Sequence, residues 1–200
     1  MQLEELPSVI TQNRFNKKGL VETKSGLLVP AYVGSQLGFN VPGRFYLENI
    51  LYPKLRRELG VFPLCPFSAC AEYLDFSELN DNMSVKEFRA FWEKFNRTIG
   101  HVNYQTLFPK SKFLIALFDG SHASDDGLCT EVGIFSTTGK PIIGIRSDFR
   151  LAENVAAPIN PAVRSVIDYE PYDGLFFEGP QAYENAYKAI KNLADKIRQE

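Results

Sequence analysis

Short runs of apolar residues alternate along the chain with longer stretches in which apolar and polar positions follow a helical spacing. The segment 113–118 is apolar throughout, which is typical of a central strand buried on both faces of a parallel sheet. Apolar runs bounded or interrupted by glycine or proline predict further strands at 27–33, 61–66 and 141–145. The segment 163–167 is another short apolar piece.

The remaining periodic segments predict helices at 42–59, 85–99, 131–138 and 182–198. Gly60 and Gly139 follow the first and third of these as stop signals. Ser84 precedes the second, and Glu87 lies three residues later, so we expect a capping box there. The apolar face of this second helix is aromatic, and we expect it to pack in the core. Its members are Phe88, Phe91, Trp92 and Phe95.

Strands and helices therefore alternate, which predicts an α/β fold. We expect a flavodoxin/Rossmann-like three-layer sandwich with a mostly parallel central sheet. The chain has no evident linker or internal repeat, so we expect one domain over 1–200, with 1–28 as an N-terminal extension that contains a hairpin. Ligands of such sheets lie beyond the carboxyl ends of the strands. Polar clusters follow predicted strands at 32–40 and 119–131.

Composition narrows the class of protein but does not identify it. With 44% hydrophobic and 23% charged residues, the chain has the composition of a globular protein. The net charge is −2 and no basic stripe runs along the sequence, which argues against a nucleic-acid polymer as partner. The three cysteines lack zinc-site spacing, and we interpret them as reduced thiols. An acidic N-terminus and the absence of a long apolar run predict a cytoplasmic protein without membrane contact.

The segment 119–133 is the candidate for chemistry, because a loop rich in carboxylates follows the most apolar strand directly. We expect Glu131 to open a helix there, where the dipole would stabilise its anion by about 0.3–1 kcal/mol. An ionised glutamate is the form that attacks a sugar carbon. Two other interpretations remain open from the residues alone. One is a capped helix with a solvated acidic loop. The other is a site for a hard cation, although the loop lacks the alternating ligand spacing of a calcium loop.

The same segment resembles the nucleoside 2-deoxyribosyltransferase family. The shared pattern is ordered and covers about 35 residues after an apolar strand. It consists of an Asp-Gly pair, Asp-x-Gly-x-x-x-Glu-x-Gly, a short helix, Gly-Lys-Pro, a strand and Asp-x-Arg. In this chain its elements are Asp119-Gly120, Asp125, Gly127, Glu131, Gly133, Gly139-Lys140-Pro141, Asp148 and Arg150. The chain departs from the family at Leu128, where many members have Thr, and at Lys112, where an Asp is usual.

Three further pieces extend the resemblance from about residue 30 to the end of the chain. The segment 32–40 is similar to the first-strand loop of the family, which begins with Tyr and ends in Leu-Gly-Phe-Ser. Asn103 lies near a family Asn or Asp that faces the nucleobase. Asn160 resembles an Asn that a neighbouring subunit contributes to the sugar site. The resemblance thus implies a single nucleoside 2-deoxyribosyltransferase-like domain.

The resemblance implies a transfer of the 2-deoxyribosyl group between nucleobases through a covalent ester on Glu131. Tyr32 would hold the carboxylate in line, and Asp125 would contact the sugar; both are expected in the catalytic group. The expected substrate-binding residues are Gly34, Phe39, Asn103, Asp119, Gly127 and Asn160. The general acid is unassigned, with Asp119 and Asp125 as candidates. The family chemistry implies no metal and no cofactor. A composite site implies a homodimer or higher homo-oligomer that acts on 2′-deoxyribonucleosides and free nucleobases.

Two other functions compete with transfer. A 2′-deoxynucleoside 5′-monophosphate N-glycosidase on the same fold would use water as acceptor and would need phosphate ligands in the first loop. That loop offers Ser35, but no arginine follows it until Arg44. A non-catalytic nucleotide-binding module would keep the fold without turnover. Glu131 and Asp125 argue against this last function.

Overall fold

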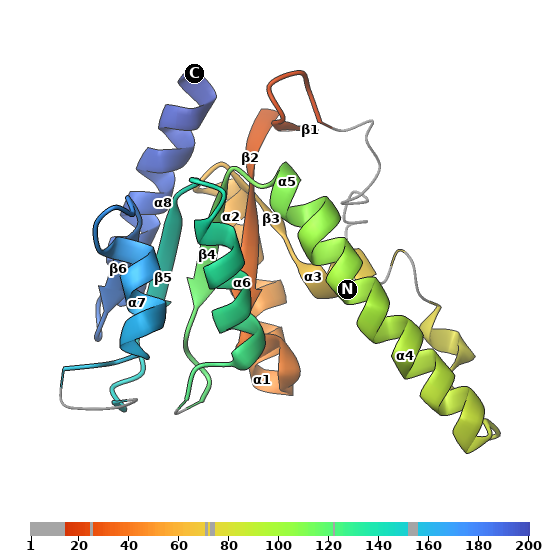
Figure 1. Ribbon diagram of the computed structural model, residues 1–200. Helices are drawn as coiled ribbons and strands as arrows, with labels where there is room; N and C mark the ends of the chain where they lie inside the picture. Colours follow the sequence, from red (N-terminus) through yellow and green to blue (C-terminus); the bar gives the residue numbers. More distant parts are fainter. Residues whose placement is uncertain (1–14, 25, 71, 73–74, 122, 152–155) are drawn as a thin grey trace.

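The computed structural model describes residues 15–200 except 25, 71, 73–74, 122 and 152–155. Helices cover both faces of a central sheet, so the predicted three-layer α/β sandwich is confirmed (Figure 1). The strands are β1 Val21–Thr23, β2 Gly26–Ser35, β3 Val61–Leu64, β4 Phe113–Leu117, β5 Ile142–Arg146 and β6 Leu175–Glu178. Five of them run parallel in the order β3-β2-β4-β5-β6, and only β1 pairs antiparallel, with the start of β2.

The strand order places a topological switch between β2 and β4. The chain leaves β2 toward β3 on one side and returns as β4 on the other side. Ser35 pairs with Leu117 at the carboxyl ends of these two strands. In parallel sheets, ligands generally bind where the connections diverge in this way, outside the carboxyl ends of the strands. The fold therefore puts the two polar clusters of the sequence at one edge of the sheet.

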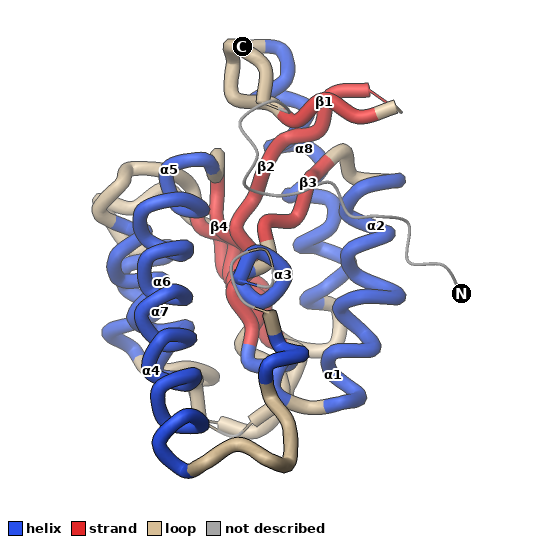
Figure 2. Tube along the Cα trace, turned by 90° about the vertical axis from the view of Figure 1, so that its right-hand side faces the viewer, coloured by secondary structure: helices blue, strands red, loops and turns tan. Residues whose placement is uncertain are grey.

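Side-chain alternation along the strands divides the core into two layers. Tyr32, Leu114 and Ala116 face one layer, whereas Val33 and Ile115 face the other. Figure 2 shows the sheet between these layers, with α4, α6 and α7 on one side and α1 and α2 on the other. The helices are α1 Val41–Tyr46, α2 Tyr52–Arg57, α3 Pro66–Cys70, α4 Val85–His101, α5 Phe108–Lys110, α6 Asp126–Ser136, α7 Pro161–Asp168 and α8 Ala182–Gln199.

Several predicted helices have the expected position. A π-helical turn, η3 (Leu47–Leu51), joins α1 to α2, so 42–59 is helical over most of its length as predicted. The capping box of α4 is present, because the Ser84 side chain accepts from the Glu87 N–H and the Glu87 carboxylate accepts from the Ser84 N–H. The 182–198 helix is confirmed as α8. The described part of the extension forms the predicted hairpin through the β1–β2 pair, while 1–14 lie outside the described residues.

Other parts of the fold were not predicted from the sequence. The segment 163–167 belongs to a helix, α7, which Asn160 caps. The chain after Asn103 is not a loop, because α4 continues through the π-helical turn η5 (Val102–Leu107) into α5. Strand β6 was missed, since its half-exposed edge position requires no continuous apolar run.

The aromatic face of α4 is only partly in the core. Phe91 is 4% exposed, but Phe88 is 49% and Trp92 is 37% exposed. Figure 1 shows the first turns of α4 extending beyond the sheet, away from α6 and α7. The prediction of a buried face was therefore wrong for Phe88 and Trp92, which lie on the projecting part of the helix. No helix among the described residues is long and apolar enough to cross a membrane.

Candidate active site

Glu131 lies in the second turn of α6 and points at the end of β2. Its Oε1 accepts a hydrogen bond from the Tyr32 hydroxyl at 2.5 Å and a second from Asn103 Nδ2 at 3.2 Å. The three side chains come from α6, β2 and η5, which are far apart in sequence. Tyr32 is fully buried, and Asn103 is 6% exposed. Two neutral donors therefore fix one oxygen of a single carboxylate.

Gly34 creates the space that the Glu131 carboxylate occupies. A Cβ atom at Gly34 would lie 2.8 Å from Glu131 Oε2 and 2.6 Å from Leu128 Cδ1. Contacts this short are not tolerated, so any larger residue at Gly34 would displace the carboxylate or the helix. Gly34 thus allows α6 to approach β2 closely, and its predicted contact with substrate stays a prediction.

Burial raises the pKa of the Glu131 carboxyl to about 7. The Tyr32 hydrogen bond opposes this shift, and the negative charge of Asp125 adds to it. The prediction that Glu131 opens a helix and is held as an anion by the dipole was wrong. Helix α6 begins at Asp126, so Glu131 lies beyond the first turn, where the dipole effect fades.

The phenol of Tyr32 stays protonated under all ordinary conditions. Burial, followed by the nearby charge of Glu131, raises its pKa well above the usual value. Tyr32 is therefore a donor that does not titrate alongside Glu131. Its ring packs edge-on against Phe108 with a centroid distance of 4.7 Å, which fixes the direction of the hydroxyl.

Asn103 uses only half of its amide within the protein. Nδ2 donates to Glu131, whereas Oδ1 is buried and has no hydrogen-bond partner among the residues that the structure describes. An unpaired buried acceptor costs about 1–3 kcal/mol, which is unusual outside functional sites. The contact of Asn103 with Glu131 was not predicted from the sequence.

Asp125 and Asn160 both act as helix N-caps. Asp125 Oδ1 accepts from the Leu128 N–H at 2.8 Å, and Asn160 Oδ1 accepts from the Ala162 N–H at 2.9 Å. A Cβ at Gly127 would lie 2.9 Å from Asp125 Oδ1, so the cap explains this glycine without a ligand. The contacts with sugar hydroxyls expected for Asp125 and Asn160 stay predictions.

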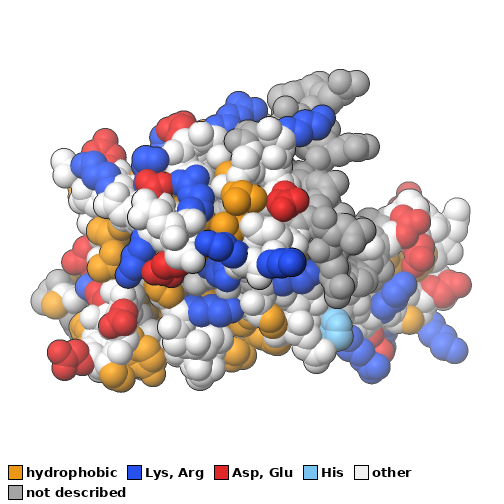
Figure 3. All heavy atoms as spheres, turned by 90° about the horizontal axis from the view of Figure 1, so that it is seen from above, with side chains coloured by type: hydrophobic (Ala, Val, Ile, Leu, Met, Phe, Trp, Pro, Cys, Tyr) orange, Lys and Arg blue, Asp and Glu red, His pale blue; other side chains and the backbone are white. Residues whose placement is uncertain are grey.

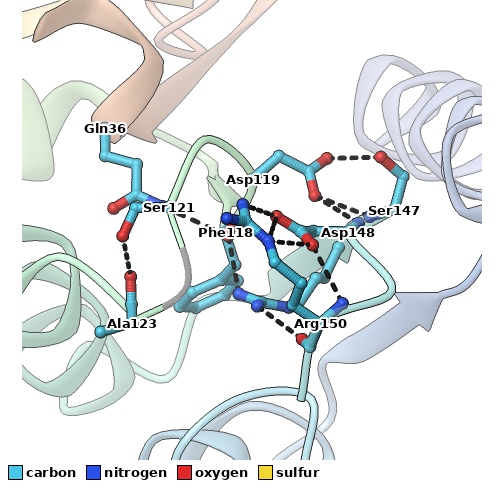
Figure 4. A network of polar contacts seen from close by, with 9 residues as sticks. Gln36, Phe118, Asp119, Ser121, Ala123, Ser147, Asp148 and Arg150 are labelled. Carbon is cyan, nitrogen blue, oxygen red and sulfur yellow. Dashed lines mark hydrogen bonds and ion pairs between the residues drawn. The ribbon is translucent and has the colours of Figure 1, made fainter. Parts of the chain in front are cut away.

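Asp119 anchors the loop after β5 to the loop after β4 (Figure 4). Its carboxylate accepts from the Ser147 N–H, the Ser147 hydroxyl and the Asp148 N–H, at 2.8–2.9 Å. Asp148 forms an ion pair with Arg150 beside it. The Asp119 carboxylate thus already accepts hydrogen bonds from backbone and hydroxyl donors. These bonds leave fewer of its lone pairs for the predicted contact with substrate.

A second set of contacts holds the Phe118 carbonyl at the switch point. Arg146 Nη1 donates to it at 2.9 Å and Gln36 Nε2 at 3.4 Å (Figure 4). Arg146 is fully buried, and its Nη2 also donates to the Arg150 carbonyl. These bonds tie the loops after β2, β4 and β5 together. Gln36 and Arg146 were not predicted from the sequence. They follow or end different strands, and only the fold brings them to the same carbonyl.

Some of the predicted site residues come together in the structure, and others do not. Tyr32, Gly34, Asn103 and Glu131 meet at one point, and Asp125 is close enough to influence the pKa of Glu131. The contacts that join this group do not include Phe39, which is 69% exposed and packs edge-on against the Phe67 ring at 5.3 Å.

Tyr104 is a further neighbour of the carboxylate that the sequence analysis missed. Burial raises its pKa, and the charge of Glu131 raises it further. Tyr104 directly follows Asn103 in the chain and is 38% exposed, so it offers an accessible ring beside the site. Its proximity depends on the π-helical turn η5, which no local pattern predicts.

Within the described residues, no group of three or more His, Cys, Asp or Glu side chains is placed to hold a metal ion. Cys65, Cys70 and Cys129 are free thiols. The carboxylates of Asp119, Asp125 and Glu131 each accept from a different set of donors.

Comparisons with known proteins establish the fold. No protein-family model and no curated protein matches the sequence. Among solved structures, the chain is similar to a conserved protein from Enterococcus faecalis, with a TM-score of 0.52 and 17% identity, over 83% of this chain and 99% of that one. It also matches a 2-desoxiribosyltransferase from Leishmania mexicana, with a TM-score of 0.46 and 17% identity, over 82% and 97% of the two chains.

Proposed function

We propose that this chain is an enzyme that transfers the 2-deoxyribosyl group between nucleobases, with Glu131 as its nucleophile. The observation that carries the proposal is the partly buried Glu131 carboxylate at the switch point, whose Oε1 accepts from Tyr32 and Asn103. The resemblance of 119–150 to the nucleoside 2-deoxyribosyltransferases supports the same chemistry.

The hydrogen bonds suggest which oxygen reacts. Tyr32 and Asn103 occupy Oε1, which leaves Oε2 of Glu131 to attack C1′ of the nucleoside. The new bond joins Oε2 to C1′, while the bond from C1′ to the base breaks and its electron pair leaves with the base. A second base then attacks C1′ and releases the carboxylate. Two displacements of this kind return the original configuration, as in retaining glycosidases.

A raised pKa is compatible with this role because the transition state is cationic. At neutral pH, a carboxyl with a pKa of about 7 is partly protonated, and only the anion attacks. Positive charge that develops at C1′ favours the anion within a site poorly screened by water. Stabilisation is therefore larger in the transition state than in the free enzyme, which is the condition for catalysis.

We further propose that Asp125 and Asn160 contact the sugar hydroxyls in an assembled homodimer or higher oligomer. Asp125 lies beside Glu131 in the same chain, whereas Asn160 caps α7. A second copy would bring its Asn160 to the site. Light scattering tests the assembly, and mixing inactive Glu131→Gln with inactive Asn160→Ala chains tests the shared site. Mixed oligomers should regain part of the activity, and failure to do so would place both residues in one chain.

One contact keeps the monophosphate hydrolase as a second candidate. Arg44 donates from Nη2 to the Gly38 carbonyl at 3.3 Å, which brings its guanidinium onto the first loop. An arginine on this loop is suited to a 5′-phosphate. Ser35, the other phosphate candidate, already caps η2 (Gln36–Phe39) by accepting from the Leu37 N–H.

Base exchange distinguishes the candidates. The protein is mixed with 2′-deoxyinosine and adenine, and products are separated by chromatography, with Glu131→Ala as control. We expect 2′-deoxyadenosine from the wild type and none from the variant. Hypoxanthine without 2′-deoxyadenosine would indicate a hydrolase, which is then tested on deoxynucleoside monophosphates. No turnover, with pyrimidine donors included, would overturn the proposal in favour of a binding module.

A further inference from the structure

A lysine-rich cavity lies at the opposite end of the sheet from Glu131. It has a volume of about 430 Å³ and lies beside the starts of β4 and β5 and the end of α8. Four lysines line it: Lys18, Lys112, Lys140 and Lys196. Figure 3 looks onto this end of the molecule and shows Lys and Arg side chains gathered near its centre.

The fold brings these lysines together from four separate segments. Lys18 belongs to the turn before β1, and Lys196 lies in the last turns of α8. Lys112 immediately precedes β4, where its N–H donates to the Pro30 carbonyl at 2.8 Å. Lys140 lies just before β5. The cluster is therefore a product of tertiary structure, which explains why no basic stripe appears in the sequence.

Backbone carbonyls hold one of the ammonium groups in place, and a second ammonium group lies close to backbone. Lys140 Nζ donates to the carbonyls of Phe108 and Pro109 at 2.9 and 3.2 Å. A Cβ at Gly19 would lie 3.3 Å from Lys112 Nζ, so this ammonium group rests against the turn that carries Lys18. Lys112 and Lys140 are thus the less exposed members of the cluster, and Lys18 and Lys196 lie at its more exposed rim.

The protein offsets the positive charge of the cavity only in part. Among the described residues, none of the four lysines forms a salt bridge with a carboxylate. Glu200 is the acidic residue that lines the cavity. Burial lowers the pKa of Lys140, and the charge of Lys112 lowers it further, which shows that the two cations repel each other. An anion between them would relieve this repulsion.

We propose that this cavity binds a small anion with two or more linked phosphates. Lysine ammonium groups bind phosphate as point charges, and several converging lysines favour a polyphosphate over a single phosphate. The volume lies in the range of small-ligand sites, which is about 300–1,000 Å³. Leu193, Ile197 and Pro141 supply an apolar wall beside the lysines, suited to an attached organic group. The proposal is independent of the reaction at Glu131.

Calorimetric titration with inorganic tripolyphosphate tests the charge requirement. We expect saturable binding to the wild type that weakens as salt is added, because the contacts are screened. The double variant Lys112→Gln with Lys196→Gln should bind about a hundredfold more weakly. The matched control, Lys86→Gln with Lys188→Gln, removes the same charge from exposed positions elsewhere and should stay within about twofold of the wild type. Circular dichroism verifies that each variant is folded, and the single variant Lys196→Gln, exposed at a helix end, provides a milder test.

The ligand source is resolved in a second series. A nucleoside triphosphate that binds more tightly than tripolyphosphate would indicate a nucleotide, with the apolar wall holding its base or sugar. Equal affinities would indicate a site for the phosphate chain alone. The proposal is overturned if tripolyphosphate does not bind to the wild type, or if the control double variant loses as much affinity as the cavity variant.

Discussion

The charged side chains at the two ends of the sheet differ in sign and in how the protein pairs them. At the carboxyl end, the Glu131 carboxylate is partly buried, and one of its oxygens accepts hydrogen bonds from two neutral donors of the protein. At the amino end, Lys112 and Lys140 face an open cavity without a carboxylate partner among the described residues. A charge enclosed by neutral donors has an altered pKa and is suited to chemistry. A cluster of like charges left open to water is suited to binding a counter-charge. We therefore expect that substitutions at one end of the sheet impair the function of that end and leave the function of the other end unchanged.

The largest effect is expected from Glu131→Gln. The amide keeps the size of the side chain but cannot form the ester, so base exchange should fall by about a thousandfold or more. Tripolyphosphate binding at the lysine cavity should be unchanged. The rate of base exchange and the calorimetric affinity for tripolyphosphate are measured on the same preparation of the variant. An equal loss of base exchange and of tripolyphosphate binding would mean that the variant is misfolded, and it would contradict the independence of the two ends.

Gly34→Ala should be the next most damaging change. The added methyl group meets Leu128 and Glu131 Oε2, which forces the nucleophile out of line. We expect a loss of about a hundredfold in exchange and of about 1–3 kcal/mol in the free energy of unfolding. Gly133→Ala is the matched control on α6, because a Cβ there meets nothing within 4 Å. This control should keep activity and gain slightly in stability. Wild-type activity in Gly34→Ala would contradict the close approach of α6 to β2.

Tyr32→Phe should reduce exchange by about tenfold and shift its pH dependence, because a hydrogen bond to the reacting carboxylate is lost. In the wild type, kcat/KM should rise with pH around a midpoint near 7, as Glu131 ionises. The Tyr32 hydroxyl lowers the pKa of Glu131, so its removal moves the midpoint to higher pH. A pH profile of kcat/KM for both proteins measures the shift. An unchanged midpoint in Tyr32→Phe would contradict the effect of the Tyr32 hydroxyl on the pKa of Glu131.

A pair of substitutions at Asp125 separates its cap from its charge. Asp125→Asn keeps an effective N-cap, whereas Asp125→Ala loses it and should cost about 1 kcal/mol in the free energy of unfolding. Both remove a negative charge that raises the pKa of Glu131, so both should move the midpoint of kcat/KM to lower pH. Denaturant unfolding and pH profiles measure the two effects. A loss of stability in Asp125→Asn equal to that in Asp125→Ala would argue against the capping role.

A further effect, seen only as a function of pH, is the contribution of Glu131 to stability. Its pKa is raised from 4.5 to about 7 in the folded chain, so folding favours the protonated form. That contribution is fully present below pH 4.5 and is lost as the pH rises through 7. Urea unfolding of the wild type and Glu131→Gln over this range measures it. The difference in stability between the two proteins should shift against the wild type as the pH rises, and a constant difference would contradict the raised pKa.

Sequence patterns predicted the parts of the fold that follow local rules. The run 113–118 and the capping box at Ser84 each contain their own structural signal, and both predictions are confirmed. The start of α6 was misplaced because Asp126 and Gly127 are typical of loops. Asp125 nevertheless caps a helix there, and packing of Val132 in the core stabilises it.

The arrangement around Glu131 was only partly predictable. The Tyr32 contact was predicted from the resemblance, and the hydrogen bond is present in the structure. The contact of Asn103, the proximity of Tyr104 and the raised pKa of Glu131 all depend on how α6 and η5 meet the end of β2. The lysine cavity likewise joins four distant segments. Such features depend on tertiary packing and have no local pattern.

The most direct test of the central claim is to identify the covalent intermediate. The wild type is incubated with 2′-deoxyinosine without an acceptor base, quenched in acid, digested and analysed by mass spectrometry. We expect a deoxyribosyl ester on the peptide that contains Glu131, which disappears when adenine is added before the quench. Base exchange by an enzyme that shows no such adduct, or an adduct on another residue, would contradict the assignment of Glu131 as the nucleophile.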